Sequence, residues 1–156
     1  MDVASALHRM PHLEVLELQL NHMGPAGGSA ILASVANLQA IEAVGGKGLT
    51  SLRIGGNGVG ATGLDDRLSY LTRLGTLDLS ESGLRERDDY KTLGPALISL
   101  SASLTSLDLS RNHVDAFQTS ISSLTGLTEL TLSDVRLQVG MSPPFPLLEA
   151  SLQSRT

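Results

Sequence analysis

The stretch Leu104-Thr105-Ser106-Leu107-Asp108-Leu109-Ser110-Arg111-Asn112-His113-Val114 carries the pattern on which the predicted fold depends. Leucines occupy its first, fourth and sixth positions, asparagine its ninth position and an apolar residue its eleventh. Four other segments keep the apolar positions of this spacing: Leu13-Leu16-Leu18-Asn21-Met23, Leu49-Leu52-Ile54-Asn57-Val59, Leu74-Leu77-Leu79-Ser82-Leu84 and Leu127-Leu130-Leu132-Val135-Leu137. Five copies indicate an internal repeat, and a repeat determines architecture before any other feature.

Each copy predicts one short strand followed by a return segment. In the first copy Leu16 and Leu18 alternate with Glu17, which is the period of a strand with one buried face. The copies begin near residues 13, 49, 74, 104 and 127, so crossover segments separate the strands and the strands must be parallel. We therefore predict one α/β domain over residues 1–156, with a parallel sheet lining one face and mostly helical return segments on the other. Residues 140–156 are predicted to form an irregular tail.

Apolar spacing also predicts the helices of the return segments. A helix that begins at Pro25 carries its apolar stripe on Ile31, Val35, Leu38 and Ile41, and the pattern leaves open whether it continues to Val44. Shorter helices are predicted over 2–10 and 62–71. Another is predicted to end near Leu100. The pattern leaves open whether it starts directly after the charged loop 85–89 or only at Pro95, because proline is tolerated in a first turn. The fourth return segment is predicted at 117–124.

The pattern L-x-x-L-x-L-x-x-N-x-L resembles the leucine-rich repeat family over residues 13–137. Segments 21–27 and 57–63 are similar to the N-x-L-G-x-x-G loops of the ribonuclease-inhibitor-like class, which is typically intracellular. The resemblance implies a curved leucine-rich repeat solenoid, with a mostly helical convex side and a concave parallel sheet that binds another macromolecule. It also implies an asparagine ladder, in which Asn21, Asn57 and Asn112 bond to the backbone of neighbouring repeats. Ser82 is a weaker substitute and Val135 cannot take this role, so the ladder is expected to be interrupted at the third repeat and lost at the fifth.

Composition restricts the classes of partner. The formal net charge is −5, with 16 acidic and 11 basic residues, which argues against nucleic acid and anionic membrane surfaces. The absence of cysteine excludes disulfide-stapled modules and cysteine-ligated metals. The N-terminal residues lack the pattern of a signal peptide. These features predict a cytoplasmic chain that binds neither nucleic acid nor membranes.

One segment resembles a nucleotide-binding motif. Segment 58–63 has glycines at its first, third and sixth positions, and Asp78 lies 20 residues after its first glycine, which is close to the dinucleotide fingerprint. However, two of the glycines recur as Gly24 and Gly27 in the first repeat, and Asp78 recurs as Asp108 in the fourth. The repeat therefore accounts for the motif without a cofactor. Because no nucleophile, metal-ligand or acid–base constellation was found either, we predict a protein that is not an enzyme, with a nucleotide-binding enzyme as a remote alternative.

The remaining strand positions are expected to point to the concave face and to contact a partner. Acidic residues outnumber basic ones six to two among the candidates Glu17, Arg53, Asp78, Glu81, Asp108, Arg111, Glu129 and Asp134. Such a face could steer a basic protein toward it, although ordinary solvated strand residues have the same composition. We therefore predict a protein–protein interaction module. An alternative is a small-GTPase regulator, because GTPase activators occur among ribonuclease-inhibitor-like proteins, with Arg85 or Arg111 as the candidate contact.

Overall fold

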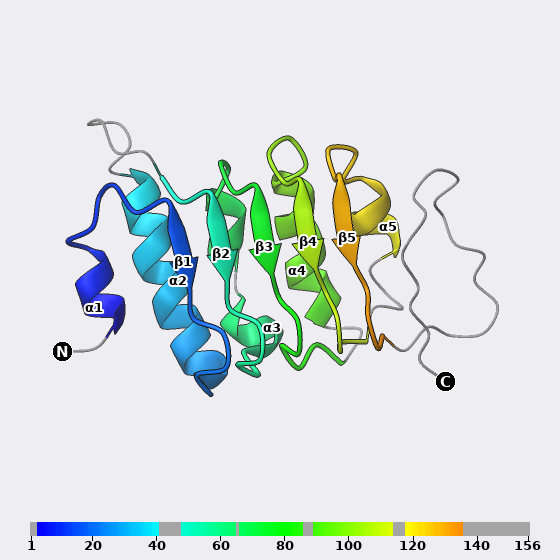
Figure 1. The fold of residues 1–156 in the computed structure, drawn as a ribbon, viewed down its shortest axis with the longest axis horizontal. Coiled ribbons are helices and arrows are strands. Elements are labelled where there is room, and N and C mark those ends of the chain that lie inside the picture. Colours follow the sequence, from blue (N-terminus) through cyan, green and yellow to red (C-terminus); the bar gives the residue numbers. More distant parts are fainter. Residues whose placement is uncertain (1–2, 41–47, 65, 86–88, 114–117, 136–156) are drawn as a thin grey trace.

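Five parallel strands form a single sheet in which the strand order follows the sequence (Figure 1). The computed structural model describes residues 3–40, 48–64, 66–85, 89–113 and 118–135. β1 and β5 are the edges of the sheet, whose strands are β1 (Val15–Glu17), β2 (Ser51–Arg53), β3 (Thr76–Asp78), β4 (Ser106–Asp108) and β5 (Glu129–Thr131). This arrangement confirms the predicted α/β solenoid.

The register of the sheet follows the repeat. The leucine at the fourth repeat position is the middle residue of every strand, so these leucines lie side by side from Leu16 to Leu130. In the three inner strands this leucine is at most 1% exposed. A shift of one residue would expose all of them, because successive strand residues point to opposite faces.

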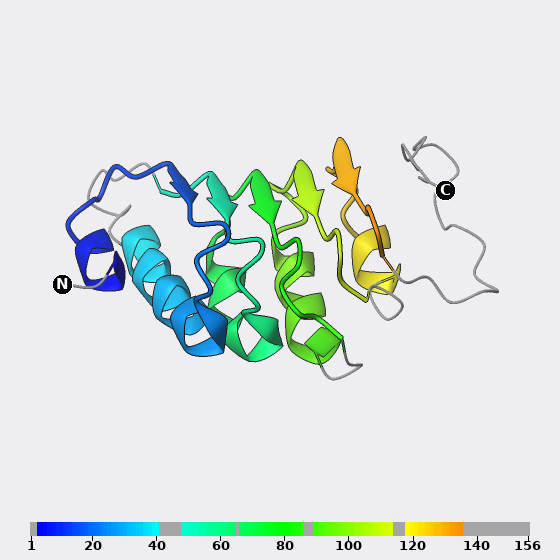
Figure 2. The ribbon, with the colours of Figure 1, turned by 60° about the horizontal axis from the view of Figure 1, so that its bottom comes forward.

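All described helical segments lie on the same side of the sheet, and no described segment covers its other side (Figure 2). We call the uncovered side the open face. The helical layer consists of α1 (Val3–Leu7), α2 (Gly24–Ala40), α3 (Gly60–Gly63), the 3-10 helix η2 (Asp66–Tyr70), α4 (Asp89–Ser99) and α5 (Gln118–Ser122).

Leucines fill the space between the two layers, with isoleucine, valine and alanine beside them. The described consensus positions of the second, third and fourth repeats are almost fully buried. In the end repeats Leu16 is buried, but most of the described apolar consensus positions are only partly buried, as at Leu13 and Leu18 in the first repeat and Leu130 and Leu132 in the fifth. Burial of apolar area is the main stabilising term, so the inner repeats contribute most of it.

The helix predicted in the second repeat was wrong. The single helix over 62–71 is instead α3, which ends at Gly63, and η2. Leu64 leaves helical geometry, with φ −104° and ψ 35°, and its N–H bonds to the carbonyl of Ala61. The apolar face was nevertheless assigned correctly, because Leu64, Leu68 and Leu71 are all 0% exposed.

The next helix has the earlier of the two starts that the sequence left open. α4 begins at Asp89 and contains Pro95 in its interior. A proline there removes one backbone hydrogen bond, and the burial of Leu93 and Leu97 on the same helix compensates for this loss.

The first helix is shorter than predicted, since it ends at Leu7 and the N–H of Met10 then bonds to the Leu7 carbonyl in a turn. α2 follows the prediction as far as Ala40. The predictions for Val44, Leu137 and the tail at 140–156 lie outside the described residues.

Candidate functional site

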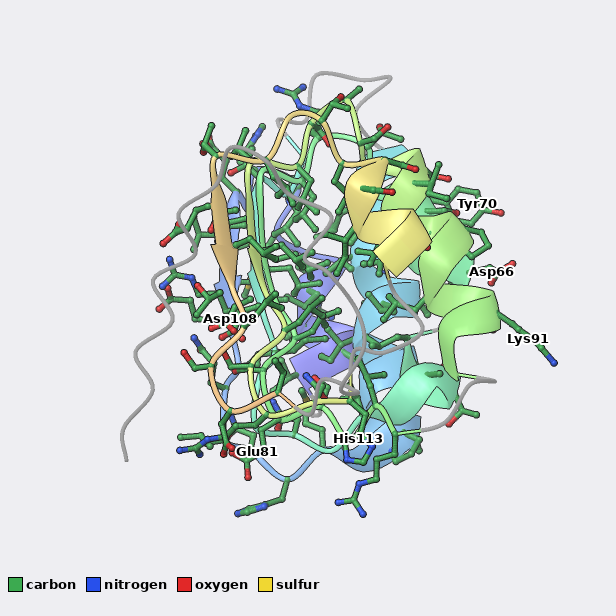
Figure 3. All side chains as sticks on the ribbon, turned by 90° about the vertical axis from the view of Figure 1, so that its right-hand side faces the viewer. Asp66, Tyr70, Glu81, Lys91, Asp108 and His113 are labelled. Atoms are coloured by element: carbon green, nitrogen blue, oxygen red, sulfur yellow. The ribbon has the colours of Figure 1, made fainter. Side chains whose placement is uncertain are left out.

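The open face carries one column of candidate residues in continuous register. Glu17, Arg53, Asp78, Asp108 and Thr131 pair in this order across the five strands. Neighbouring strands lie about 4.8 Å apart, so these side chains are close enough to interact. Figure 3, which views the sheet along its edge, shows Asp108 on the open side, whereas Asp66, Tyr70 and Lys91 lie on the helical side.

Both arginines of the predicted site are already paired with carboxylates. Arg53 Nη1 lies 3.2 Å from Glu17 Oε1, and Arg111 Nη1 lies 3.1 Å from Glu81 Oε2. All four side chains are about half exposed, so each pair contributes about 0–1 kcal/mol to stability. The pairs therefore have a larger effect on the charge of the open face than on the stability of the fold. Arg111, one candidate for a GTPase contact, is held in such a pair.

The other four acidic candidates form no ion pair with any described residue. Asp78 Oδ1 accepts hydrogen bonds from the N–H and hydroxyl of Ser80, at 2.9 and 2.7 Å. Asp108 Oδ1 accepts the N–H of Ser110 at 2.8 Å. Glu129 Oε2 accepts the Ser106 hydroxyl at 2.7 Å. The fourth, Asp134, lies beyond the end of β5.

Asp78 and Asp108 are the central feature of this group. They are directly opposite each other on the neighbouring strands β3 and β4. Like charges in such a position repel and reduce stability. The open face therefore carries a strip of carboxylates over β3, β4 and β5 that form no ion pair within the described part of the chain.

A hollow lies where the strands end, and sequence reasoning did not predict it. Two adjoining cavities, of about 710 and 340 Å³, share Leu20, Gly56, Glu81 and Arg111 in their walls. The second repeat has Gly55 and Gly56 where other repeats have larger side chains, and the side chains of Asp78 and Leu20 lie over these glycines. We call this hollow the strand-end notch. Figure 3 shows Glu81 at the corresponding end of the sheet.

A left-handed residue follows every strand. The φ angles are positive, between 47° and 70°, at Leu20, Gly56, Glu81, Arg111 and Asp134. A residue with a side chain pays about 1–2 kcal/mol for this conformation. The repeat therefore gives the residues at the rim of the notch the same left-handed backbone conformation. The sequence showed that these residues follow the strands, but it did not show their left-handed conformation.

The asparagines bond across the repeats. Asn57 Oδ1 accepts the N–H groups of Asn21 and Met23, at 2.8 and 3.3 Å, and its Nδ2 donates to the Leu18 carbonyl at 2.8 Å. Asn112 makes the same contacts with the third repeat. Ser82 is one of the groups that Asn112 holds.

Glycines of the nucleotide-like motif serve packing in the second repeat. A Cβ at Gly63 would lie 2.8 Å from the Pro25 carbonyl oxygen and 2.9 Å from its Cα, so this glycine permits α3 to approach α2. The N–H of Gly60 is bonded to the Ser82 carbonyl. No group of three metal-ligating side chains occurs among the described residues. In the same part of the chain, no helix has the length and apolar character needed to cross a bilayer.

The comparisons agree with this architecture. A family model described as a leucine-rich repeat matches residues 9–32, 49–65 and 100–116, which contain the first, second and fourth repeats. A search of curated proteins found no match. The three family matches and the five-stranded parallel sheet together identify the chain as an α/β leucine-rich repeat solenoid.

Proposed function

We propose that this protein is a non-catalytic interaction module whose open face binds a protein partner rich in basic side chains. Leucine-rich repeat domains in general mediate protein–protein interaction, since stacked repeats provide an extended surface. The observation that carries the more specific proposal is the pair of opposed carboxylates Asp78 and Asp108, neither of which forms an ion pair with a described residue. Arg53 lies opposite Asp78 on β2, but its guanidinium is paired with Glu17.

Charge relief is the physical reason for a basic partner. A lysine or arginine between Asp78 and Asp108 would remove their mutual repulsion and could bond to both carboxylates. The carboxylate oxygens already accept hydrogen bonds from the serines that follow, so the acceptors are held in place before a partner arrives. Such pre-organisation lowers the entropic cost of binding.

Two ion pairs flank the carboxylates of β3, β4 and β5 on the open face. Arg53 with Glu17 and Arg111 with Glu81 are each neutral overall. A basic partner would therefore be drawn to β3, β4 and β5 rather than to β1 and β2. We further infer that the first two repeats belong to the ribonuclease-inhibitor-like class, which their glycine loops and the 17-residue helix α2 support.

The experiment measures binding of a lysine-rich peptide by calorimetry, with a glutamate-rich peptide of equal length as the reference probe. We expect the lysine-rich peptide to bind and its affinity to fall with added salt, because exposed charges are screened. The double variant Asp78→Asn with Asp108→Asn should lower this affinity about tenfold, which corresponds to about 1.4 kcal/mol. Asp66→Asn, an exposed carboxylate on the helical side, is the matched control and should leave it unchanged. Equal losses for the two variants, or preference for the glutamate-rich peptide, would contradict the proposal.

A further inference from the structure

We infer that the strand-end notch binds an acidic side chain of the partner, at a fixed distance from the basic side chain that lies over Asp78 and Asp108. This inference rests on the proposed function, because it gives the same partner a second contact. Its evidence comes from the charges in the walls of the two cavities, the backbone that holds them, the glycines between them and the distance to Asp108.

The two cavities of the notch differ in charge. Asp108 lies in the wall of the smaller cavity, together with Glu81 and Arg111, so carboxylates outnumber arginines there. Arg85 and His113 line the larger cavity, which shares Glu81 and Arg111 with the smaller one. Glu81 is the only carboxylate among the described residues of this larger wall. A basic corner, formed by Arg85, Arg111 and His113, therefore adjoins the strip of carboxylates on the open face.

Buried backbone contacts hold the basic corner in place. The N–H of His113 donates to the Leu84 carbonyl at 2.9 Å, and this bond brings His113 close to Arg85, the residue after Leu84. The N–H of Leu84 in turn donates to Asn112 Oδ1 at 3.2 Å. Leu84 and Asn112 are 0% and 2% exposed. The third and fourth repeats thus fix the backbone of the corner before a partner arrives, which lowers the entropic cost of binding.

Arg111 has donors left for a second carboxylate. A guanidinium carries five N–H donors in a fixed plane. Nη1 of Arg111 lies 3.1 Å from Glu81 Oε2, and the side chain makes no other contact within the described part of the chain. Its side chain is 64% exposed and lies in the walls of both cavities. A carboxylate that enters the notch can therefore bond to Arg111 while the pair with Glu81 persists.

Two glycines keep the middle of the larger cavity open. The tenth repeat position is His22 in the first repeat and His113 in the fourth, but it is Gly58 and Gly83 in the repeats between them. A Cβ at Gly58 would meet no atom within 4 Å, and a Cβ at Gly83 would meet only the Cα of Gly58, at 3.8 Å. No side chain from this position blocks the way to the basic corner.

The distance from Asp108 to the basic corner sets the spacing of charges in the partner. Figure 3 shows Glu81 and His113 at the same end of the sheet, whereas Asp108 lies further along the open side. Arg111 follows Asp108 by three residues, and His113 follows it by five. An extended chain advances about 3.3 Å per residue, so a carboxylate about four residues from the basic side chain would reach the corner.

The inference is tested by calorimetry with two lysine-rich peptides that have the same lysines and amidated C-termini. One peptide has glutamate four residues before and four residues after its central lysine, so either chain direction can bring a carboxylate to the notch. The other peptide has glutamine at both places. We expect the glutamate peptide to bind about fivefold tighter, which is the upper range for an exposed ion pair. Without a basic corner, glutamate should weaken binding to this acidic face.

Arg111→Gln should remove the preference for the glutamate peptide, and Arg53→Gln is the matched control. Arg53 is also a half-exposed arginine paired with a carboxylate, 3.2 Å from Glu17, but it lines neither cavity. Loss of either arginine changes the general attraction for lysine, so the ratio of the two affinities is compared. This ratio should stay at about fivefold in Arg53→Gln. Gly58→Asn, which places a side chain in the larger cavity, should also remove the preference, since asparagine tolerates the left-handed φ of 57° at this position.

The outcomes separate this inference from the proposed function. If neither peptide binds, the proposed function fails and the inference fails with it. If both peptides bind and glutamate gives no tighter binding, only the inference fails. A preference that survives in Arg111→Gln or Gly58→Asn, or that is lost equally in Arg53→Gln, would also overturn the inference, because the carboxylate would then bind outside the notch.

Discussion

Replacement of Asn112 by alanine should be among the most damaging polar substitutions in this chain. Asn112 is 2% exposed. Its Oδ1 accepts the N–H groups of Ser82 and Leu84, at 3.1 and 3.2 Å. Its Nδ2 donates to three carbonyls, those of Leu79, Leu109 and Ser110, at 2.7–3.2 Å. One amide thus bonds the backbone of two repeats.

The magnitude follows from the groups left without a partner. Ser82 and Leu84 are both 0% exposed, so water cannot replace the lost acceptor. A buried donor without a partner costs about 1–3 kcal/mol, so the loss of both bonds should reduce the free energy of unfolding by about 2–6 kcal/mol. Asn112→Ser should lose less, because a hydroxyl can still accept one of the two N–H groups.

Asn21→Ala provides the matched control. Asn21 is exposed and donates to the Leu18 and Gln19 carbonyls. The Leu18 carbonyl keeps its bond from Asn57 after the substitution. We therefore expect a loss of only about 0.5–1.5 kcal/mol, the value of an ordinary hydrogen bond.

The assay is urea unfolding followed by far-ultraviolet circular dichroism, since the chain has no tryptophan. The midpoint should fall much further for Asn112→Ala than for Asn21→Ala, at a constant denaturant slope. Equal falls in the two variants would refute the reasoning, because they would show that position in the ladder does not determine the contribution of an asparagine.

Three further predictions use the same assay. Leu107→Ala should reduce the free energy of unfolding by about 2–5 kcal/mol, because Leu107 is 0% exposed. Asp108→Ala should change it by less than about 1 kcal/mol. Similar effects of the two substitutions would contradict the assignment of Leu107 to the core and Asp108 to the open face. Gly63→Ala should cost about 1–3 kcal/mol, since the new Cβ meets backbone atoms of Pro25, and a neutral result would show that α2 and α3 can separate freely. Leu20→Gly should raise the free energy of unfolding by about 0.5 kcal/mol, because glycine adopts the left-handed conformation at this position with less strain than leucine. Val15→Gly, in strand β1 of the same repeat, should lower it by about as much. A loss in both variants would show that the conformation at Leu20 is not strained.

The strands and their register could be predicted from sequence because the repeat fixes both. Leucine at the fourth and sixth positions buries one face, so each new repeat must align its leucines with those of the last one. The face assigned to Asp78 and Asp108 followed directly from this alternation. Local pattern and global fold agree at these positions, which is the condition under which sequence reasoning succeeds.

The return segments could not be predicted equally well. Their apolar residues were identified correctly, but the helix boundaries depend on local geometry. The helix predicted from spacing alone ended early at Gly63, where α3 comes close to Pro25, and α4 extended through Pro95. Apolar spacing specifies which side of a segment is buried, and it does not specify whether the turns are α or 3-10.

The strand-end notch was missed for a different reason, which also bears on function. The left-handed residue after each strand repeats with the period of the fold, so the rim of the sheet has the same backbone in every repeat. The walls of the notch include Gly55 and Gly56, where the second repeat differs from the others. Neighbouring side chains lie over these glycines, Leu20 over Gly56 and Asp78 over Gly55. A periodic backbone gives the solenoid its stability, but a particular partner can be distinguished only at positions where the repeat is broken. Under the proposed function we expect those positions to be the glycine pair and the carboxylates Asp78 and Asp108, rather than the leucines that reveal the fold.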